Sequence, residues 1–132
     1  MRYVMLDFSE AMHALARKRL GAQARRVEFV QRSFKDPAWF EGLGQFAAVV
    51  THQAVHELRH KSYAAGLHAQ VRSILGAGGS YLVCDHFAGE GGMSDSELYM
   101  TIEEQRQALL AGGFKQVSEI LRKGGMVLHH AG

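Results

Sequence analysis

Short apolar runs alternate with stretches of helical spacing along this chain. The runs that predict strands are Arg2–Asp7, Arg26–Gln31, Phe46–Thr51 and Ser80–Asp85. Phe46–Thr51 is apolar throughout, which favours a central position in a sheet. Ser9 predicts the N-cap of a helix that ends at Gly21. Residues 52–60 lead into a second helix that reaches about Leu75, with inward-facing positions predicted at Tyr63, Leu67, Val71, Ile74 and Leu75.

The remaining segments complete an alternating α/β pattern. Asp36–Phe40 predicts a single helical turn, because Asp followed by Pro suits the N-cap and first helical position. After a Gly-rich loop at His86–Asp95, Thr101–Glu104 predicts a capping box and a helix that ends at Gly112–Gly113. Phe114–Leu121 and Met126–His130 predict a hairpin. We therefore expect an α/β, Rossmann-like three-layer sandwich with a mostly parallel sheet and a C-terminal antiparallel hairpin.

Composition limits the number of domains, the class of partner and the cellular compartment. The chain has 132 residues, which predicts one domain spanning 1–132, and its formal net charge of +2 is too small to indicate a nucleic-acid partner. The single cysteine, Cys84, excludes an internal disulfide and suits a reducing compartment, so we expect a cytoplasmic protein. No apolar run is long enough to cross a membrane.

Asp7 is the first candidate for chemistry. It ends the first predicted strand, and the chain turns directly from it into a helix. In α/β folds an acid at such a strand end can accept hydrogen bonds from both hydroxyls of a ribose. A role only as a turn residue or helix cap is the alternative.

The order of these features resembles class I S-adenosylmethionine-dependent methyltransferases from Tyr3 to Ala131. The segments that carry the resemblance are Tyr3–Met12, Val27–Val30, Phe46–Val50, Leu75–Val83 and Ala111–Phe114. The resemblance implies S-adenosylmethionine as cofactor, with Asp7 and Phe8 at its ribose. It also implies that Ser33 and Phe34 lie against the adenine, although the family usually has an aspartate near Ser33. Thr51, His52 and Gln53 would then face the methionine moiety and the methyl acceptor.

The family's first strand and Gly-rich donor loop have no counterpart before Tyr3. The resemblance therefore implies a domain truncated at the N-terminus, with two unpaired strand edges. We expect a homo-oligomer, for which a strand-exchanged dimer is one arrangement. The predicted function is a methyltransferase-like protein for a small-molecule acceptor that is inactive alone. The alternative is a non-enzymatic oligomeric binding module derived from a methyltransferase.

Histidines supply the candidate acid–base chemistry. His52 or His56 could accept a proton from the acceptor's hydroxyl or amine during methyl transfer. A competing pattern, His56-Glu57-Leu58-Arg59-His60, matches the H-E-x-x-H signature of zinc hydrolases, which requires both histidines on one helical face. Nearby cations and the lack of an evident third ligand weigh against zinc, so no metal ligand is assigned.

Overall fold

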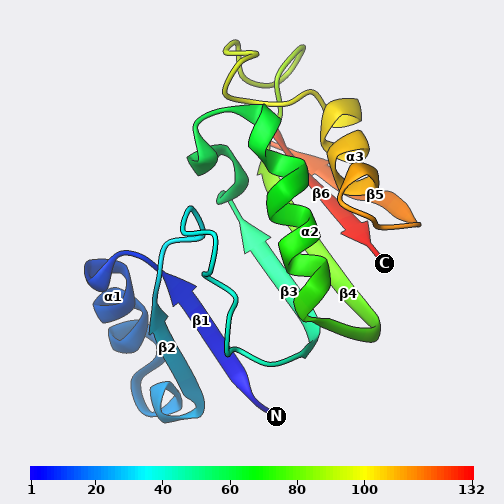
Figure 1. Ribbon diagram of the computed structural model, residues 1–132. Helices are drawn as coiled ribbons and strands as arrows, with labels where there is room; N and C mark the ends of the chain where they lie inside the picture. Colours follow the sequence, from blue (N-terminus) through cyan, green and yellow to red (C-terminus); the bar gives the residue numbers. More distant parts are fainter. The chain divides into compact units, whose positions relative to one another are not determined.

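The computed structural model describes all residues, 1–132, and they form two compact units, Met1–Glu41 and Gly42–Gly132 (Figure 1). Each unit has its own sheet, with two strands in the first and four in the second. The expectation of a single domain over 1–132 stays a prediction.

The first unit is a strand–helix–strand motif. Strands β1 (Tyr3–Asp7) and β2 (Val27–Gln31) pair in parallel, with Asp7 opposite Gln31 at their carboxyl ends. Helix α1 (Glu10–Leu20) connects them, and the Ser9 hydroxyl accepts the Met12 N–H at 3.3 Å, as predicted for an N-cap. The α-helix ends at Gly21, whose φ of 56° favours glycine, and a 3₁₀ helix, η1 (Gly21–Arg26), leads into β2.

The predicted helical turn at Asp36–Phe40 is wrong, because this segment forms consecutive turns. Asp36 Oδ1 accepts the Ala38 N–H at 2.9 Å, and the Asp36 carbonyl accepts the Trp39 N–H at 3.0 Å. The aspartate therefore closes an Asx-type turn on its own backbone, and no helix follows.

The sheet of the second unit has the strand order β3-β4-β6-β5. Its strands are β3 (Phe46–His52), β4 (Leu75–His86), β5 (Val117–Lys123) and β6 (Met126–Ala131). β3 and β4 are parallel, whereas β6 runs antiparallel to both β4 and β5. The predicted Rossmann-like α/β class with a C-terminal antiparallel hairpin is confirmed.

β3 lies at an edge of this sheet, so its predicted central position is wrong. β4 is its partner on one side, and Val50 in its middle is 65% exposed. β1 is likewise an edge strand of its own two-stranded sheet. Both strands thus have an apolar sequence in an edge position.

Helices α2 (Ala64–Ile74) and α3 (Ile102–Ala111) pack against each other on one face of this sheet (Figure 1). The buried residues of α2 include Leu67, Val71 and Ile74, as predicted. Tyr63 is 62% exposed, because the α-helix begins only at Ala64. Tyr81, Val127 and Leu109 complete the core between helices and strands.

The start of β4 differs from the sequence prediction, which began this strand at Ser80. The glycines at 76–79 belong to β4, which begins at Leu75, and a register shift between Phe46 and Ala48 accommodates them.

The capping box of α3 forms as predicted: Thr101 Oγ1 accepts the Glu104 N–H at 3.1 Å, and Glu104 Oε1 accepts the Thr101 N–H at 3.0 Å. None of the helices is both long and apolar enough to span a bilayer.

Candidate functional site

The first unit places Asp7 at the carboxyl end of β1, where its side chain caps the turn into α1. Asp7 Oδ1 accepts the Ser9 N–H at 2.9 Å, and the Asp7 carbonyl accepts the Arg32 N–H at 3.2 Å. The carboxylate keeps Oδ2 and further lone pairs for a ligand. The turn role and the ribose role are therefore compatible in one side chain.

The other candidates in this unit surround the ends of β1 and β2. Phe8 is 62% exposed, and its carbonyl accepts from the Gln31 side chain at 3.3 Å. Ser33 Oγ accepts the Lys35 N–H at 3.2 Å, so the hydroxyl caps its own turn, while Phe34 is partly buried. Ser33 thus provides no carboxylate where the family usually has one.

The second unit brings His56 and Asp85 together at the carboxyl ends of β3 and β4. His56 Nδ1 lies 2.6 Å from Asp85 Oδ1, and the His56 backbone N–H donates to Asp85 Oδ2 at 3.0 Å. The His86 N–H donates to Oδ1 at 2.8 Å. Asp85 is 4% exposed, so this carboxylate is buried and satisfied by charge-assisted hydrogen bonds.

This arrangement defines the chemistry that His56 can perform. Because the carboxylate can only accept, Nδ1 carries the proton and Nε2 is left as the basic atom of a neutral ring. Glu57 Oε1 lies 3.4 Å from Nε2, near any proton that Nε2 would hold. A histidine oriented in this way by a carboxylate is suited to accept a proton from a substrate.

A pocket surrounds this pair, and we call it the His56 pocket. Its lining includes His56, Lys61, Asp85, His86, Tyr99 and Gln105. The ring centroid of Tyr99 lies 5.3 Å from that of His56 and 6.1 Å from that of His86. His68 also lines the pocket, and burial lowers its pKa to about 4, so this side chain is neutral at physiological pH.

Gln105 is a pocket residue that the sequence analysis missed. It is 4% exposed, and its Nε2 donates to the His86 carbonyl at 3.0 Å. Its Oε1 is buried without a hydrogen-bond partner. The signal was present in the sequence: Gln105 lies three residues after Ile102 and four before Leu109, on the apolar face of α3.

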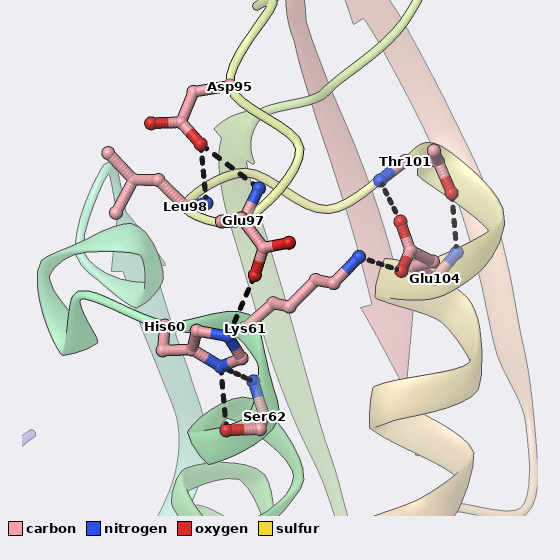
Figure 2. Close-up of polar contacts among 8 residues, drawn as sticks. All are labelled: His60, Lys61, Ser62, Asp95, Glu97, Leu98, Thr101 and Glu104. Atoms are coloured by element: carbon pink, nitrogen blue, oxygen red, sulfur yellow. Dashed lines mark hydrogen bonds and ion pairs between the residues drawn. The ribbon is translucent and has the colours of Figure 1, made fainter.

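Polar contacts hold residues 60–62 in place beside the His56 pocket, which Lys61 lines (Figure 2). His60 Nε2 contacts Glu97 Oε2 at 3.1 Å, and Lys61 Nζ donates to Glu104 Oε2 at 2.7 Å (Figure 2). Asp95 Oδ1 accepts the backbone N–H groups of Glu97 and Leu98. These contacts link the segment before α2 to the loop at 95–98 and to the first turn of α3.

The other candidates at the end of β3 have other partners. His52 is exposed and its Nε2 is 3.4 Å from Gln53 Nε2. Gln53 has a φ of 52°, unusual for a residue other than glycine, and its N–H donates to the Cys84 carbonyl at 2.8 Å. Thr51 is opposite Val83, with its hydroxyl buried. Of the two candidate bases, only His56 has a carboxylate partner.

The helical premise of the zinc alternative is wrong. His56 and Glu57 lie in a short 3₁₀ helix, η2 (Val55–Leu58), which ends at Arg59 in the left-handed region. His60 is extended and caps the next 3₁₀ helix, η3 (Lys61–Tyr63). The two imidazoles are therefore not on one helical face, and each has a different carboxylate partner, Asp85 or Glu97.

Solved structures share this fold at low sequence identity. An O-methyltransferase family protein from Burkholderia thailandensis matches with a TM-score of 0.78 and 17% identity over 97% of this chain and 42% of its own. PigF with SAH matches with a TM-score of 0.75 and 12% identity, covering 99% of this chain and 43% of that protein. DhpI in complex with SAH has a TM-score of 0.75 and 22% identity, with 98% of this chain and 65% of DhpI covered.

This chain therefore spans less than two thirds of the length of each of these proteins. No curated protein matches its sequence. The family model described as "Methyltransferase domain" matches residues 1–79, which include β1, α1, β2, β3, α2 and the start of β4. The chain belongs to this methyltransferase domain family, as its resemblance to the class I S-adenosylmethionine-dependent enzymes implied.

Proposed function

We propose that this chain carries the ribose-binding acid and the proton acceptor of a methyltransferase that acts on a small molecule. S-adenosylmethionine is the cofactor of the family, and it supplies an electrophilic methyl group when bound. The observation that carries the proposal is the hydrogen bond between His56 Nδ1 and the buried Asp85, at 2.6 Å. Methyl-group acceptance by an oxygen or nitrogen releases a proton, and in this proposal His56 Nε2 takes it.

The residues of the first unit fit the ribose part of the cofactor. Asp7 stands at the carboxyl end of a parallel strand, the edge at which α/β sheets bind ligands. Its Oδ1 is shared with the Ser9 N–H, and Oδ2 is available to a ribose hydroxyl. Phe8, Ser33 and Phe34 follow the ends of β1 and β2 and would border the nucleoside. In the second unit, Thr51 and Gln53 lie at the end of β3, and the family resemblance assigns them to the methionine end of the cofactor.

Two features support a small-molecule acceptor with a hydrogen-bond donor. The His56 pocket contains the rings of Tyr99 and His86 beside the base. Gln105 Oε1 is a buried acceptor without a partner, and leaving such an atom unpaired costs about 1–3 kcal/mol. A hydroxyl or amine on the bound acceptor would supply the missing hydrogen bond.

In this proposal His56 forms an imidazolium after methyl transfer. The cofactor would supply the methyl group, and its sulfur would keep the electron pair of the carbon–sulfur bond that breaks. The acceptor's oxygen or nitrogen would lose its proton as it forms the new bond, and His56 Nε2 would bind that proton. Asp85 at Nδ1 and Glu57 near Nε2 stabilise the resulting positive charge. His52, which lacks a carboxylate, would contribute at most to the edge of the acceptor site.

The edge positions of β1 and β3 support a homo-oligomer, and the single cysteine supports the proposal of a cytoplasmic protein. Unpaired apolar strands are costly to expose, and a second copy that adds strands would cover them. The chain would then depend on that copy, or on further sequence, for full activity. A non-enzymatic oligomeric module is the competing function, favoured by the edge positions of β1 and β3.

Calorimetric titration of the chain with S-adenosylhomocysteine tests the proposal. We expect micromolar binding, which Asp7→Ala abolishes and Glu10→Gln leaves unchanged. Glu10 is the matched control, because it is an exposed acid of the same unit that pairs with Arg17 on α1. Absence of heat at high ligand concentration, from a folded protein, would contradict the enzyme proposal and favour the binding module.

A further inference from the structure

His13 is a buried polar residue on a helix face where an apolar side chain would be expected. It lies in α1 and is 1% exposed. Its Nε2 lies 3.1 Å from the Asp7 carbonyl oxygen and 3.1 Å from the Val30 carbonyl oxygen. The side chain therefore bridges the carboxyl ends of β1 and β2 from the helix that connects them.

The two contacts fix the tautomer of His13. Both partners are carbonyl oxygens, which only accept, so Nε2 must carry the proton and share it between them. Nδ1 is buried without a partner, and the Phe29 ring lies against the imidazole at a centroid distance of 5.4 Å. Burying such a ring is favourable only where its hydrogen bonds are formed. The two hydrogen bonds from its N–H to the Asp7 and Val30 carbonyls therefore stabilise the histidine at this buried position.

Asp7 is the residue most affected by this bridge. Its carbonyl accepts from both His13 Nε2 and the Arg32 N–H, and its carboxylate accepts from the Ser9 N–H. Among these three donors His13 supplies the side-chain contact, and it also joins Asp7 to the neighbouring strand through Val30. Loss of the His13 donor would leave two partly buried carbonyls short of a hydrogen bond and free the strand end to shift.

We propose that His13 is a positioning residue for the cofactor: its Nε2–H holds the ends of β1 and β2 so that the Asp7 carboxylate meets both ribose hydroxyls. This inference rests on the proposed role of Asp7. A small displacement of a positioned carboxylate weakens a bidentate contact strongly, because both hydrogen bonds depend on one orientation.

The test compares His13→Leu and His13→Gln in the full chain, using S-adenosylhomocysteine and its 2′,3′-dideoxy analogue as calorimetric probes. His13→Leu should weaken binding of the ribose-bearing ligand about tenfold, the equivalent of one hydrogen bond, and leave the dideoxy analogue unchanged. His13→Gln keeps an N–H donor and should restore most of the affinity. Equal weakening of both ligands by His13→Leu would overturn the proposal and assign His13 a structural role only.

Amide hydrogen exchange separates this inference from the proposed function. His13→Leu should accelerate exchange at the Arg32 and Ser9 amides, which donate to Asp7, and leave the Trp39 amide, which donates to Asp36, unchanged. If the wild-type chain binds no S-adenosylhomocysteine, the proposed function fails, yet this exchange pattern still decides whether His13 positions Asp7. Unchanged exchange at both amides would overturn the inference. His13→Met replaces His13→Leu should the leucine variant not fold.

Discussion

Asp85 holds His56 by two atoms at once, accepting its ring Nδ1–H at 2.6 Å and its backbone N–H at 3.0 Å. The backbone bond fixes the start of η2 against the end of β4, and the ring bond fixes the imidazole orientation. One buried carboxylate therefore determines both where the candidate base lies and which of its nitrogens is basic.

Replacing Asp85 by Asn should destabilise the chain by about 3 kcal/mol, since a buried carboxylate that accepts three hydrogen bonds is lost. The asparagine NH₂ would also face an N–H donor. Urea denaturation measures the effect. The matched control is Asp95→Asn: Asp95 also accepts two backbone amides but is exposed, so its variant should lose less than about 1 kcal/mol. Equal losses of unfolding free energy in the two variants would contradict a greater contribution of the buried Asp85 to stability.

Acid should destabilise the second unit through His68. Burial, followed by the charge of His129, lowers the pKa of His68 from 6.5 to about 4, while its Nδ1 lies 3.1 Å from the Tyr81 hydroxyl. The unfolded chain binds a proton at this residue below about pH 6.5 and the folded chain does not, so stability is complete above pH 6.5 and falls between pH 6.5 and 4. The loss attributable to His68 at pH 4 is about 3 kcal/mol.

Denaturation midpoints measured from pH 7.5 to 4 test this expectation. His68→Leu should flatten the pH dependence in that window, although it is less stable at neutral pH because the Tyr81 hydroxyl loses its partner. His60→Ala is the control, since the His60 side chain is 44% exposed, and it should retain the wild-type slope. If the His68→Leu variant kept the wild-type pH dependence of its denaturation midpoint, a group other than His68 would cause the loss of stability in acid.

Thr101→Ala should cost about 1 kcal/mol, because it removes the hydroxyl that accepts the Glu104 N–H at the start of α3. Thermal unfolding measures the loss. Glu103→Gln, in the same turn but with an exposed side chain, should change stability by less than about 0.5 kcal/mol. A Thr101→Ala variant as stable as the wild type would show that the capping box does not hold this helix.

Substitution by alanine should change stability in opposite directions at Gly66, which lies in α2, and at Gly112, the C-cap of α3. A Cβ at Gly112 would lie 2.8 Å from the Cβ of His68 and 3.1 Å from the Ala69 nitrogen, so Gly112→Ala should force α2 and α3 apart and destabilise by about 2 kcal/mol. Gly66 lies in α2 with nothing within 4 Å of the added atom, so Gly66→Ala should stabilise by about 0.5–1 kcal/mol. Chemical denaturation of both variants checks the contrast. Stabilisation by both substitutions would mean that helix propensity, and not the close approach to α2, governs Gly112.

Part of the fold was readable from the sequence because it depends on neighbours along the chain. The caps at Ser9 and Thr101 formed where the residue types predicted them, since a hydroxyl satisfies amides only two or three residues away. The alternating apolar runs gave β1, β2 and β3 within one residue at each end. Asp7 at the end of β1 followed from the same local pattern.

Tertiary structure decided what depends on distant pairing. His56 and Asp85 are 29 residues apart, and they meet only because β4 pairs beside β3 and ends at the same edge. Strand pairing also decides three other features. β3 lies at an edge, glycines lie inside β4, and the H-E-x-x-H segment is interrupted by the left-handed backbone of Arg59. Local sequence determined the elements and their caps, whereas sheet pairing determined which histidine meets the buried carboxylate of Asp85, because a hydrogen bond between distant residues exists only after the strands are placed.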